Sequence, residues 1–102
     1  MTKILLACAM GMSTSLLVSK MKEAANDLDG EYKIWAIDID SIDDEDDYDI
    51  VLLGPQVSYK LKEVIEDVDN KDIPIHVIDK MDYGTCNGEA VLKFAIDALN
   101  NK

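Results

Sequence analysis

The sequence predicts an α/β fold, a three-layer sandwich in which a four-stranded parallel sheet carries helices on both faces. Two observations predict it: four short apolar runs, typical of buried strands, alternate along the chain with three stretches of helical periodicity. Strands that alternate with helices pair in parallel through right-handed crossovers. The 102 residues fit one domain, residues 1–102, with a single modest core.

The first half of the chain contains two of the strands. Residues 3–7 (KILLA) form an apolar run that suits a buried strand, and residues 33–39 (KIWAIDI) are rich in β-forming side chains. Between them a helix is predicted from Thr14 to the turn at Asp29-Gly30. Its apolar stripe, at steps of four, three and four, consists of Leu17, Met21, Ala24 and Leu28.

The second half repeats this alternation. Residues 49–53 (DIVLL) form a continuously apolar strand that stops at Gly54-Pro55, and residues 74–78 (PIHVI) form the fourth strand. Residues 84–88 are expected to form a loop before a helix that runs to the end. The apolar stripes of the second and third helices are Val57, Leu61, Val64 and Val68, and then Val91, Phe94 or Ala95, and Ala98.

The strand order follows from the same composition. The strands at 3–7 and 49–53 are the most uniformly apolar and belong in the centre, whereas the other two carry polar residues or proline and belong at the edges. The predicted order is 2-1-3-4. In such a sheet the winding reverses between strands one and three, and ligands bind there, beyond the carboxyl ends of the strands. Residues 8–14 and 54–57 meet at that point.

The charge balance narrows the classes of partner. Ten lysines, no arginine and 21 acidic residues give a formal net charge of −11, which argues against nucleic-acid binding. No apolar run reaches the roughly 18 residues of a membrane span, and a secretory signal pattern is missing, so we expect a cytoplasmic protein without direct membrane insertion. No metal and no cofactor are expected, because neither a His/Cys cluster nor a C-x-x-C motif occurs. A monomer with transient partners is expected.

Residues 38–49 (DIDSIDDEDDYD) form an acidic tract. This composition fits a cation site or a recognition surface for a basic partner, but a solvated loop is the favoured interpretation. A calcium loop of the EF-hand kind is disfavoured, because the tract lacks the required glycine and the flanking helices.

The loop after the first strand carries the candidate chemistry. Cys8 leaves the buried strand, and the chain then turns through Gly11 into a helix whose start is rich in hydroxyl groups. The N–H groups of a helix amino terminus bind a tetrahedral anion and also favour a thiolate. Cys8 is therefore predicted to be a nucleophile that accepts a phosphoryl group. The predicted phosphoryl-binding residues are Ala9, Met10, Gly11, Met12, Ser13, Thr14 and Ser15.

A comparison with the low-molecular-weight tyrosine phosphatases sharpens this prediction. Those enzymes have a cysteine, five residues and then an arginine on a loop of this shape, and the predicted sheet resembles theirs. Here Thr14 stands at the arginine position. Without the arginine fork a dianionic transition state is not held at two points, so hydrolysis is expected to be slow and a phosphocysteine to persist. A carrier needs such persistence.

Three segments resemble the IIB subunit of the bacterial phosphoenolpyruvate-dependent sugar phosphotransferase system, of the lactose/cellobiose/chitobiose type. They are CAMGMSTSLLVSKM (8–21), VLLGPQVSYKL (51–61) and VIDKMDYGTCNG (77–88). The resemblance implies that Cys8 takes a phosphoryl group from a phosphohistidine of a IIA subunit. It further implies that the group passes to a sugar held by the membrane-embedded IIC subunit, a β-linked disaccharide such as cellobiose, chitobiose or lactose. The acidic tract departs from the family pattern and leaves the docking surfaces undefined.

Two other functions stay open on the sequence. A small phosphatase-like hydrolase is disfavoured by the missing arginine, although Asp82-Tyr83 matches the place where those enzymes keep a general acid. We interpret both residues as part of a loop. A non-catalytic flavodoxin-like module that binds a partner or a flavin would not need Cys8. A receiver domain fits less well, because no acidic pair follows the first strand.

Single residues outside these patterns have two interpretations each. Cys86 is a resolving thiol or, more simply, a loop cysteine, and His76 is a phosphate relay or a surface residue. Gln56 either bonds the cysteine loop or caps the second helix, and capping is favoured. Met10 and Met12 form an apolar rim for partners or pack locally.

Overall fold

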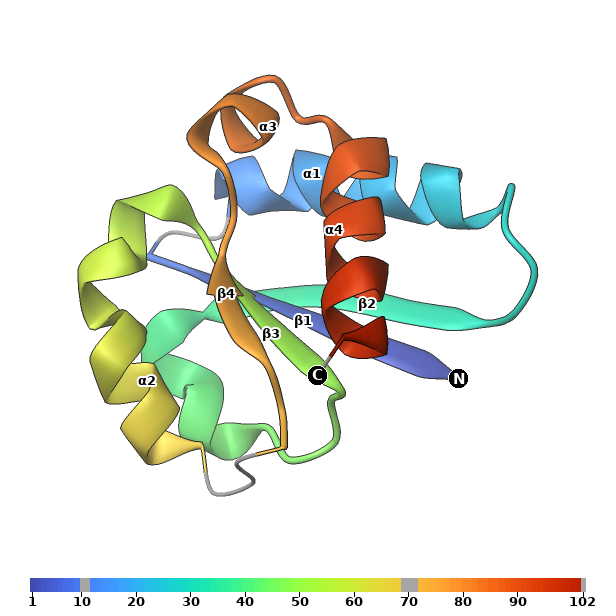
Figure 1. The fold of residues 1–102 in the computed structure, drawn as a ribbon. Coiled ribbons are helices and arrows are strands. Elements are labelled where there is room, and N and C mark those ends of the chain that lie inside the picture. The colour runs from blue at the N-terminus through green and yellow to red at the C-terminus, as the bar shows by residue number, and fades with distance from the viewer. Residues whose placement is uncertain (10–11, 69–71, 102) are drawn as a thin grey trace.

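The computed structural model describes residues 1–9, 12–68 and 72–101, without the side chains of residues 12 and 13. Four strands form one parallel sheet in the order β2-β1-β3-β4 (Figure 1). The predicted order and parallel pairing are confirmed. The strands are β1 (Thr2–Cys8), β2 (Tyr32–Asp38), β3 (Ile50–Leu53) and β4 (Ile75–Val77).

Helices cover both faces of the sheet. The helices α1 and α4 lie on one side of the strands, and α2, η1 and η2 lie on the other (Figure 1). In the part of the chain that the structure describes, no helix is long and apolar enough to cross a bilayer. The α-helices are α1 (Met12–Ala25), α2 (Leu61–Asp67), α3 (Lys80–Gly84) and α4 (Gly88–Asn100), and the 3₁₀ helices are η1 (Ile39–Asp44) and η2 (Pro55–Lys60).

The predicted helices differ from the observed ones at their ends. The first helix ends at Ala25, so Leu28 lies beyond it and is exposed, although it fits the periodic stripe. The second is divided into η2 and α2, and the helical backbone is also interrupted inside η2, at Val57 (φ −114°, ψ 21°). Of the two residues predicted as alternatives for the stripe of the last helix, Ala95 is buried on α4 and Phe94 is exposed.

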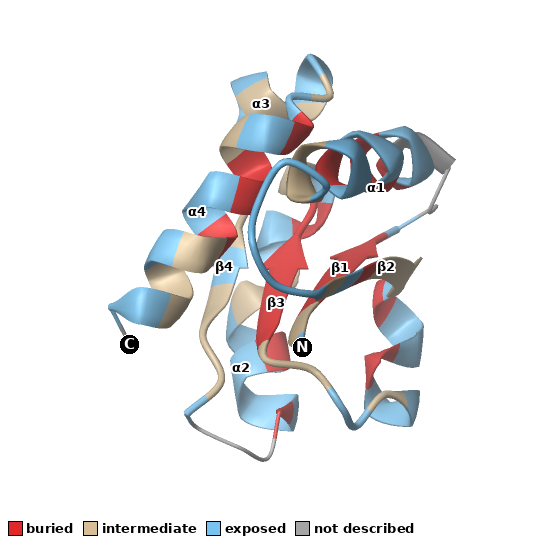
Figure 2. Cartoon of the chain, turned by 90° about the vertical axis from the view of Figure 1, so that its right-hand side faces the viewer, coloured by how far each residue is buried: buried red, intermediate tan, exposed pale blue. Residues whose placement is uncertain are grey.

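The central strand β1 separates two hydrophobic clusters. Successive side chains of a strand point to opposite faces, so Ile4 and Leu6 pack toward α1 and α4, and Leu5 and Ala7 pack toward α2 and η1. All four are fully buried, and Figure 2 shows the buried interior of β1 and β3 between the helical layers. Cys8 has the parity of Ile4 and Leu6, so its side chain faces the layer that contains α1.

The acidic tract is only partly the solvated loop predicted from its composition. Its first half forms η1, which is capped by the Asp38 carboxylate and buries both of its isoleucines. Further along, Asp47 accepts a hydrogen bond of 2.7 Å from Lys3. This bond lowers the pKa of Asp47 below its ordinary value and raises that of Lys3. The small stabilisation from this exposed pair is therefore present at neutral pH and lost as the pH falls through the lowered pKa of Asp47.

The loop between α3 and α4 contains a strained residue. Cys86 has φ 52°, in the left-handed region that costs an ordinary side chain roughly 1–2 kcal/mol. We expect Cys86→Gly to raise the free energy of unfolding by up to about 1 kcal/mol, because relief of this strain exceeds the added entropy of the unfolded chain. Urea unfolding checks this, with Cys86→Val as the control that should be less stable. A glycine variant no more stable than the valine variant would contradict the expectation.

Candidate active site

Cys8 lies at the place that the sequence predicts. It is the last residue of β1, and β1 is a central strand flanked by β2 and β3. From β1 the chain winds to β2 on one side of the sheet and then to β3 and β4 on the other. The winding therefore reverses between β1 and β3, and ligands of such sheets bind at this switch point, at the carboxyl end of β1. Only 1% of the Cys8 surface is exposed, so the protein controls what reaches its sulfur.

Thr14, in the first turn of α1, places a polar group against this sulfur. Its hydroxyl donates a hydrogen bond of 2.7 Å to Cys8 Sγ. Thr14 is itself 1% exposed, so the bond forms away from bulk water, where electrostatic interactions are strong. A hydroxyl that donates to sulfur stabilises negative charge on it. The position that holds arginine in the phosphatases therefore contacts Cys8 here.

Two residues far away in the sequence complete the surroundings of Thr14. Tyr83 Oη lies 3.1 Å from Thr14 Oγ1, and Gln56 Nε2 donates a hydrogen bond of 3.0 Å to the same Tyr83 oxygen. The interpretation of Asp82 and Tyr83 as loop residues is wrong, because both lie in α3. The expected capping role of Gln56 is wrong as well. The N-cap of η2 is Gly54, without a side-chain hydrogen bond, and the Gln56 amide is used at Tyr83.

Gly54 allows these groups to approach one another. A Cβ atom on Gly54 would lie 3.3 Å from Cys8 Cβ, 3.5 Å from Tyr83 Cε1 and 2.6 Å from Gln56 Oε1. The backbone of Gly54 is also tied to β1, since its N–H donates to the carbonyl of Ala7 at 2.9 Å. The chain after β3 therefore passes directly beside Cys8, and a side chain at this position would press on three residues of the candidate site.

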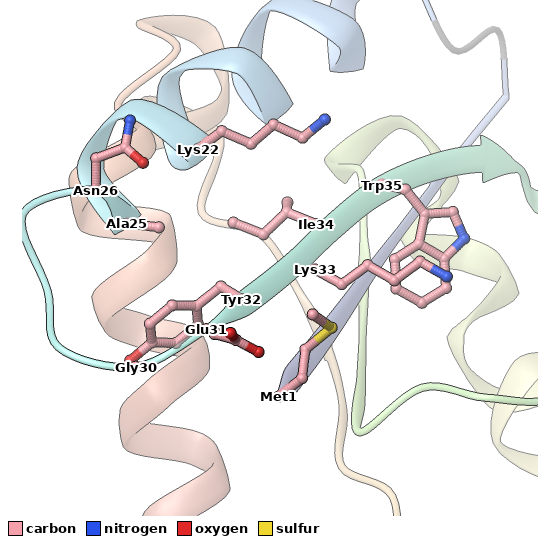
Figure 3. A pocket seen from close by; sticks show the side chains of 10 residues that line it. All are labelled: Met1, Lys22, Ala25, Asn26, Gly30, Glu31, Tyr32, Lys33, Ile34 and Trp35. Carbon is pink, nitrogen blue, oxygen red and sulfur yellow. The ribbon is translucent and has the colours of Figure 1, made fainter.

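A large hollow lies away from this site. It has a volume of about 680 Å³ and lies along α1, the following turn and the first half of β2 (Figure 3). Tyr32, which lines it, pairs with Thr2 at the amino end of β1, whereas Cys8 pairs with Asp38 at the other end. Trp35, at the other end of the lining, pairs with Leu5, so at about 3.3 Å per residue the near end of the hollow is roughly 10 Å from Cys8 along the strand. Neither Cys8 nor Thr14 lines this hollow, so it is separate from the candidate site.

A comparison with protein families decides which class of protein this is. The family model described as "PTS system, Lactose/Cellobiose specific IIB subunit" matches residues 3–94. The chain belongs to this IIB family. IIB components of the phosphotransferase system are phosphotransferases that act in sugar phosphorylation, and this chain is one of them.

Three relatives show how far the similarity extends. The chain is 44% identical over 103 residues to the PTS system oligo-beta-mannoside-specific EIIB component of Bacillus subtilis (strain 168), covering 100% of both chains. It is similar to the solution structure of a cellobiose-specific phosphotransferase IIB component protein from Borrelia burgdorferi, with a TM-score of 0.80 and 43% identity over 99% of this chain and 94% of that one. The third is the PTS system lactose-specific EIICB component of Staphylococcus epidermidis, 29% identical over 98% of this chain and 18% of that protein.

The predicted phosphoryl-binding loop of this IIB chain is described in part. Ala9 is exposed, Thr14 is buried against Cys8, and Ser15 is exposed on α1. Met10 and Gly11 lie outside the described residues, and Met12 and Ser13 are described as backbone of α1 only. The first turn of α1 contains no acidic residue, so no carboxylate there competes with a bound anion for the positive end of the helix dipole.

The remaining candidate residues of the IIB chain lie elsewhere. His76 is exposed on β4, and its ring contacts Phe94 edge to face at 5.4 Å between centroids. It therefore packs on α4 as a surface residue. Cys86 is a free, half-buried cysteine in the loop before α4. Among the described residues, no group of three or more His, Cys, Asp or Glu side chains is placed to hold a metal ion.

The contacts of Gly54 give a prediction for this IIB chain. We expect Gly54→Ala to slow phosphorylation of the protein about tenfold or more, because the added methyl group displaces Gln56 and presses on Cys8. The free energy of unfolding should fall by only about 1–2 kcal/mol, since the closest contact is a flexible side-chain end. Rates of phosphorylation and urea unfolding check both values.

The matched control for this variant is Gly84→Ala. A Cβ at Gly84 meets nothing within 4 Å, and Gly84 is the last residue of the short helix that carries Tyr83. We expect this variant to react like the natural protein. If Gly54→Ala also reacted at the natural rate, the close approach of the β3 turn to Cys8 would have no role in the chemistry.

Proposed function

We propose that this IIB chain is a phosphocarrier, a single domain of residues 1–102, in which Cys8 carries a phosphoryl group. In the first step the Cys8 thiolate attacks the phosphorus of a phosphohistidine on a IIA subunit. An S–P bond forms, the N–P bond breaks, and the histidine nitrogen keeps the electron pair and takes up a proton. In the second step a sugar hydroxyl attacks the phosphorus, the S–P bond returns its electron pair to sulfur, and the hydroxyl proton leaves to solvent.

The observation that carries this proposal is the buried hydrogen bond from Thr14 to Cys8. It stabilises the sulfur when negative charge resides there, which is the case before the first step and after the second. Because the hydroxyl is neutral and donates one hydrogen, it does not hold two phosphoryl oxygens as an arginine fork does. Attack by water on the phosphocysteine therefore lacks the help that a phosphatase supplies, and the phosphoryl group persists for transfer.

The oxygens of the phosphoryl group need donors of their own. We assign them to the N–H groups and hydroxyls of residues 9–15, which lead into the amino terminus of the 14-residue helix α1. The absence of acidic residues from the first turn of α1 supports this assignment. It accounts for binding of a small tetrahedral anion without a metal and without a cofactor.

The relatives support the partners and the class of sugar. The similar stretch in the Staphylococcus epidermidis protein is part of an EIICB component, which supports a membrane IIC subunit as the site of the acceptor. Relatives named for oligo-beta-mannosides and for cellobiose are 44% and 43% identical to this chain, so identity does not select one sugar. The proposed acceptor is a β-linked disaccharide such as cellobiose, chitobiose or lactose. The proposed exchange is cytoplasmic, and the monomeric state stays a prediction.

The test is the mass of the intact protein after incubation with phosphoenolpyruvate, the general carrier proteins and a cellobiose-type IIA subunit. We expect a gain of one phosphoryl group, located by peptide mapping on the segment that contains Cys8. The IIA subunit, checked in the same sample, must itself be phosphorylated. No gain with this donor and with a second, lactose-type donor would overturn the proposal.

The same preparation distinguishes the two other functions considered. A phosphatase-like hydrolase would release inorganic phosphate from an aryl phosphate, and we expect no release above the blank. A flavodoxin-like binding module would show flavin absorbance or would act without Cys8, and we expect neither. Release of phosphate at an enzymatic rate would replace the carrier by the hydrolase.

A further inference from the structure

The hydrogen bond from Thr14 to Cys8 is the last link of a continuous network, whose other members have no part in the proposed phosphoryl transfer so far. It runs from Gln56 in η2, through Tyr83 in α3, to Thr14 in α1 and ends at the sulfur of Cys8. The contacts measure 3.0, 3.1 and 2.7 Å in that order. Three separate elements are thus linked, one through the next, to one sulfur atom.

The hydrogens of this network have a defined direction. A threonine hydroxyl has one hydrogen, and Thr14 donates it to Cys8. In its contact with Thr14, Tyr83 must therefore be the donor. The Tyr83 oxygen in turn accepts a hydrogen from the Gln56 amide. Every hydrogen of the network points toward the sulfur, and hydrogen bonds aligned in this way polarise one another and strengthen the last one.

We propose that Gln56 and Tyr83 are positioning residues of the phosphoryl transfer. They hold the Thr14 hydroxyl in the orientation in which it donates to sulfur, and they increase its strength as a donor. This inference rests on the proposed function for the identity of the reacting group. Without Tyr83, the Thr14 hydroxyl has fewer constraints on its rotation, so the sulfur receives its hydrogen for a smaller share of the time.

Charged groups near the network do not perform this task. Asp38 is the partner of Cys8 in the register of β2, and Asp79 caps α3 next to Tyr83. Asp82 lies within α3 itself. A carboxylate near the sulfur would disfavour a thiolate, so none of the three can do what the network is proposed to do. In this proposal dipoles stabilise negative charge on the sulfur, and the network supplies dipoles that are already oriented.

The test is a double-mutant cycle read by NMR and by transfer kinetics. The pH profile of the Cys8 Cβ chemical shift reports ionisation of the thiol without any reagent or partner. We expect Tyr83→Phe, which removes one oxygen, to move this profile to higher pH by about 0.5–1 unit, the equivalent of one hydrogen bond. Gln56→Leu should move it in the same direction by less. Transfer from the phosphorylated protein to sugar should slow about three- to tenfold in Tyr83→Phe.

Coupling separates positioning from a merely structural role. Tyr83→Phe should have no further effect on the profile in a Thr14→Val background, whereas Thr14→Ser, which keeps the hydroxyl, should retain the natural profile. An equal shift by Tyr83→Phe in the presence and absence of the Thr14 hydroxyl would overturn the proposal, and so would no shift in either. Urea unfolding identifies any variant that fails to fold. If Tyr83→Phe fails to fold, Gln56→Leu, at an exposed residue, takes its place in the double-mutant cycle.

The two readouts keep the proposals distinguishable. The NMR profile needs no phosphoryl donor, so it tests the network even if Cys8 is never phosphorylated. An uncoupled profile together with normal phosphorylation would overturn the network alone. A coupled profile without phosphorylation by either donor would overturn the phosphocarrier and leave the network as a property of the thiol.

Discussion

Replacement of Cys8 by serine is expected to abolish phosphorylation of the protein while the fold remains intact. Serine keeps the size and shape of cysteine, and its hydroxyl oxygen can accept the hydrogen bond that Thr14 donates to sulfur. The buried site therefore stays filled and its polar groups stay paired. A serine hydroxyl, however, is almost never ionised at neutral pH and is a weak nucleophile in that form. We expect a loss of at least about 1,000-fold in the rate of phosphorylation.

The matched control is Cys86→Ser, which removes the other cysteine. Cys86 is half-buried in the loop before α4 and is not joined to Cys8 by a disulfide. This variant should gain one phosphoryl group at the natural rate, measured by intact mass over time. Phosphorylation of Cys8→Ser, or failure of Cys86→Ser, would identify a nucleophile other than Cys8. Urea unfolding of both variants excludes loss of the fold as the explanation.

The parts of the fold that the sequence predicts are those with a strong local pattern. The four strands and the sheet order follow from apolar runs and from their different content of charge, and both are confirmed. The helix η1 escapes prediction because its buried isoleucines stand among aspartates, so its overall composition resembles that of a loop. The helix α3 escapes because it buries no residue and has no apolar stripe. Its one local signal is Asp79, whose carboxylate accepts from the N–H groups of Met81 and Asp82.

In the candidate site too, the sequence predicts the residues that share a local pattern and misses those that are distant in the chain. Cys8 and Thr14 are six residues apart in one strand–loop–helix segment, so the local sequence pattern predicts that both belong to the same site. Tyr83 and Gln56 are separated from their partners by 69 and 27 residues, and no local pattern indicates that they meet. Their contact depends on how α3 and η2 are placed over the carboxyl ends of the strands. The steric need for glycine at position 54 cannot be predicted from the sequence for the same reason, because it arises from contacts with Cys8, Gln56 and Tyr83. The sequence Gly54-Pro55 predicts only a turn.

Replacement of Gly88 by alanine is expected to destabilise the protein strongly. Gly88 is the buried first residue of α4, and a Cβ there would lie 2.3 Å from the carbonyl carbon of Lys20 and 2.4 Å from the nitrogen of Met21. These are backbone atoms of α1, so no side-chain rotation relieves the clash. Alanine favours a helix over glycine by about 1 kcal/mol, but separation of the two helices costs more. We expect the free energy of unfolding to fall by about 3 kcal/mol or more, as measured with urea.

The same clash reaches the active site, because α1 also carries Thr14. If α1 shifts to relieve the contact with α4, the hydroxyl of Thr14 moves away from Cys8, and phosphorylation of the folded fraction should slow as well. Glu89→Ala is the control, since Glu89 is the exposed next residue of α4 and its loss should change stability by less than about 0.5 kcal/mol. Equal urea midpoints for Gly88→Ala and Glu89→Ala would show that α1 and α4 tolerate separation. The position of Thr14 would then have to be maintained by its contacts with Tyr83 and Cys8 rather than by the packing of α1.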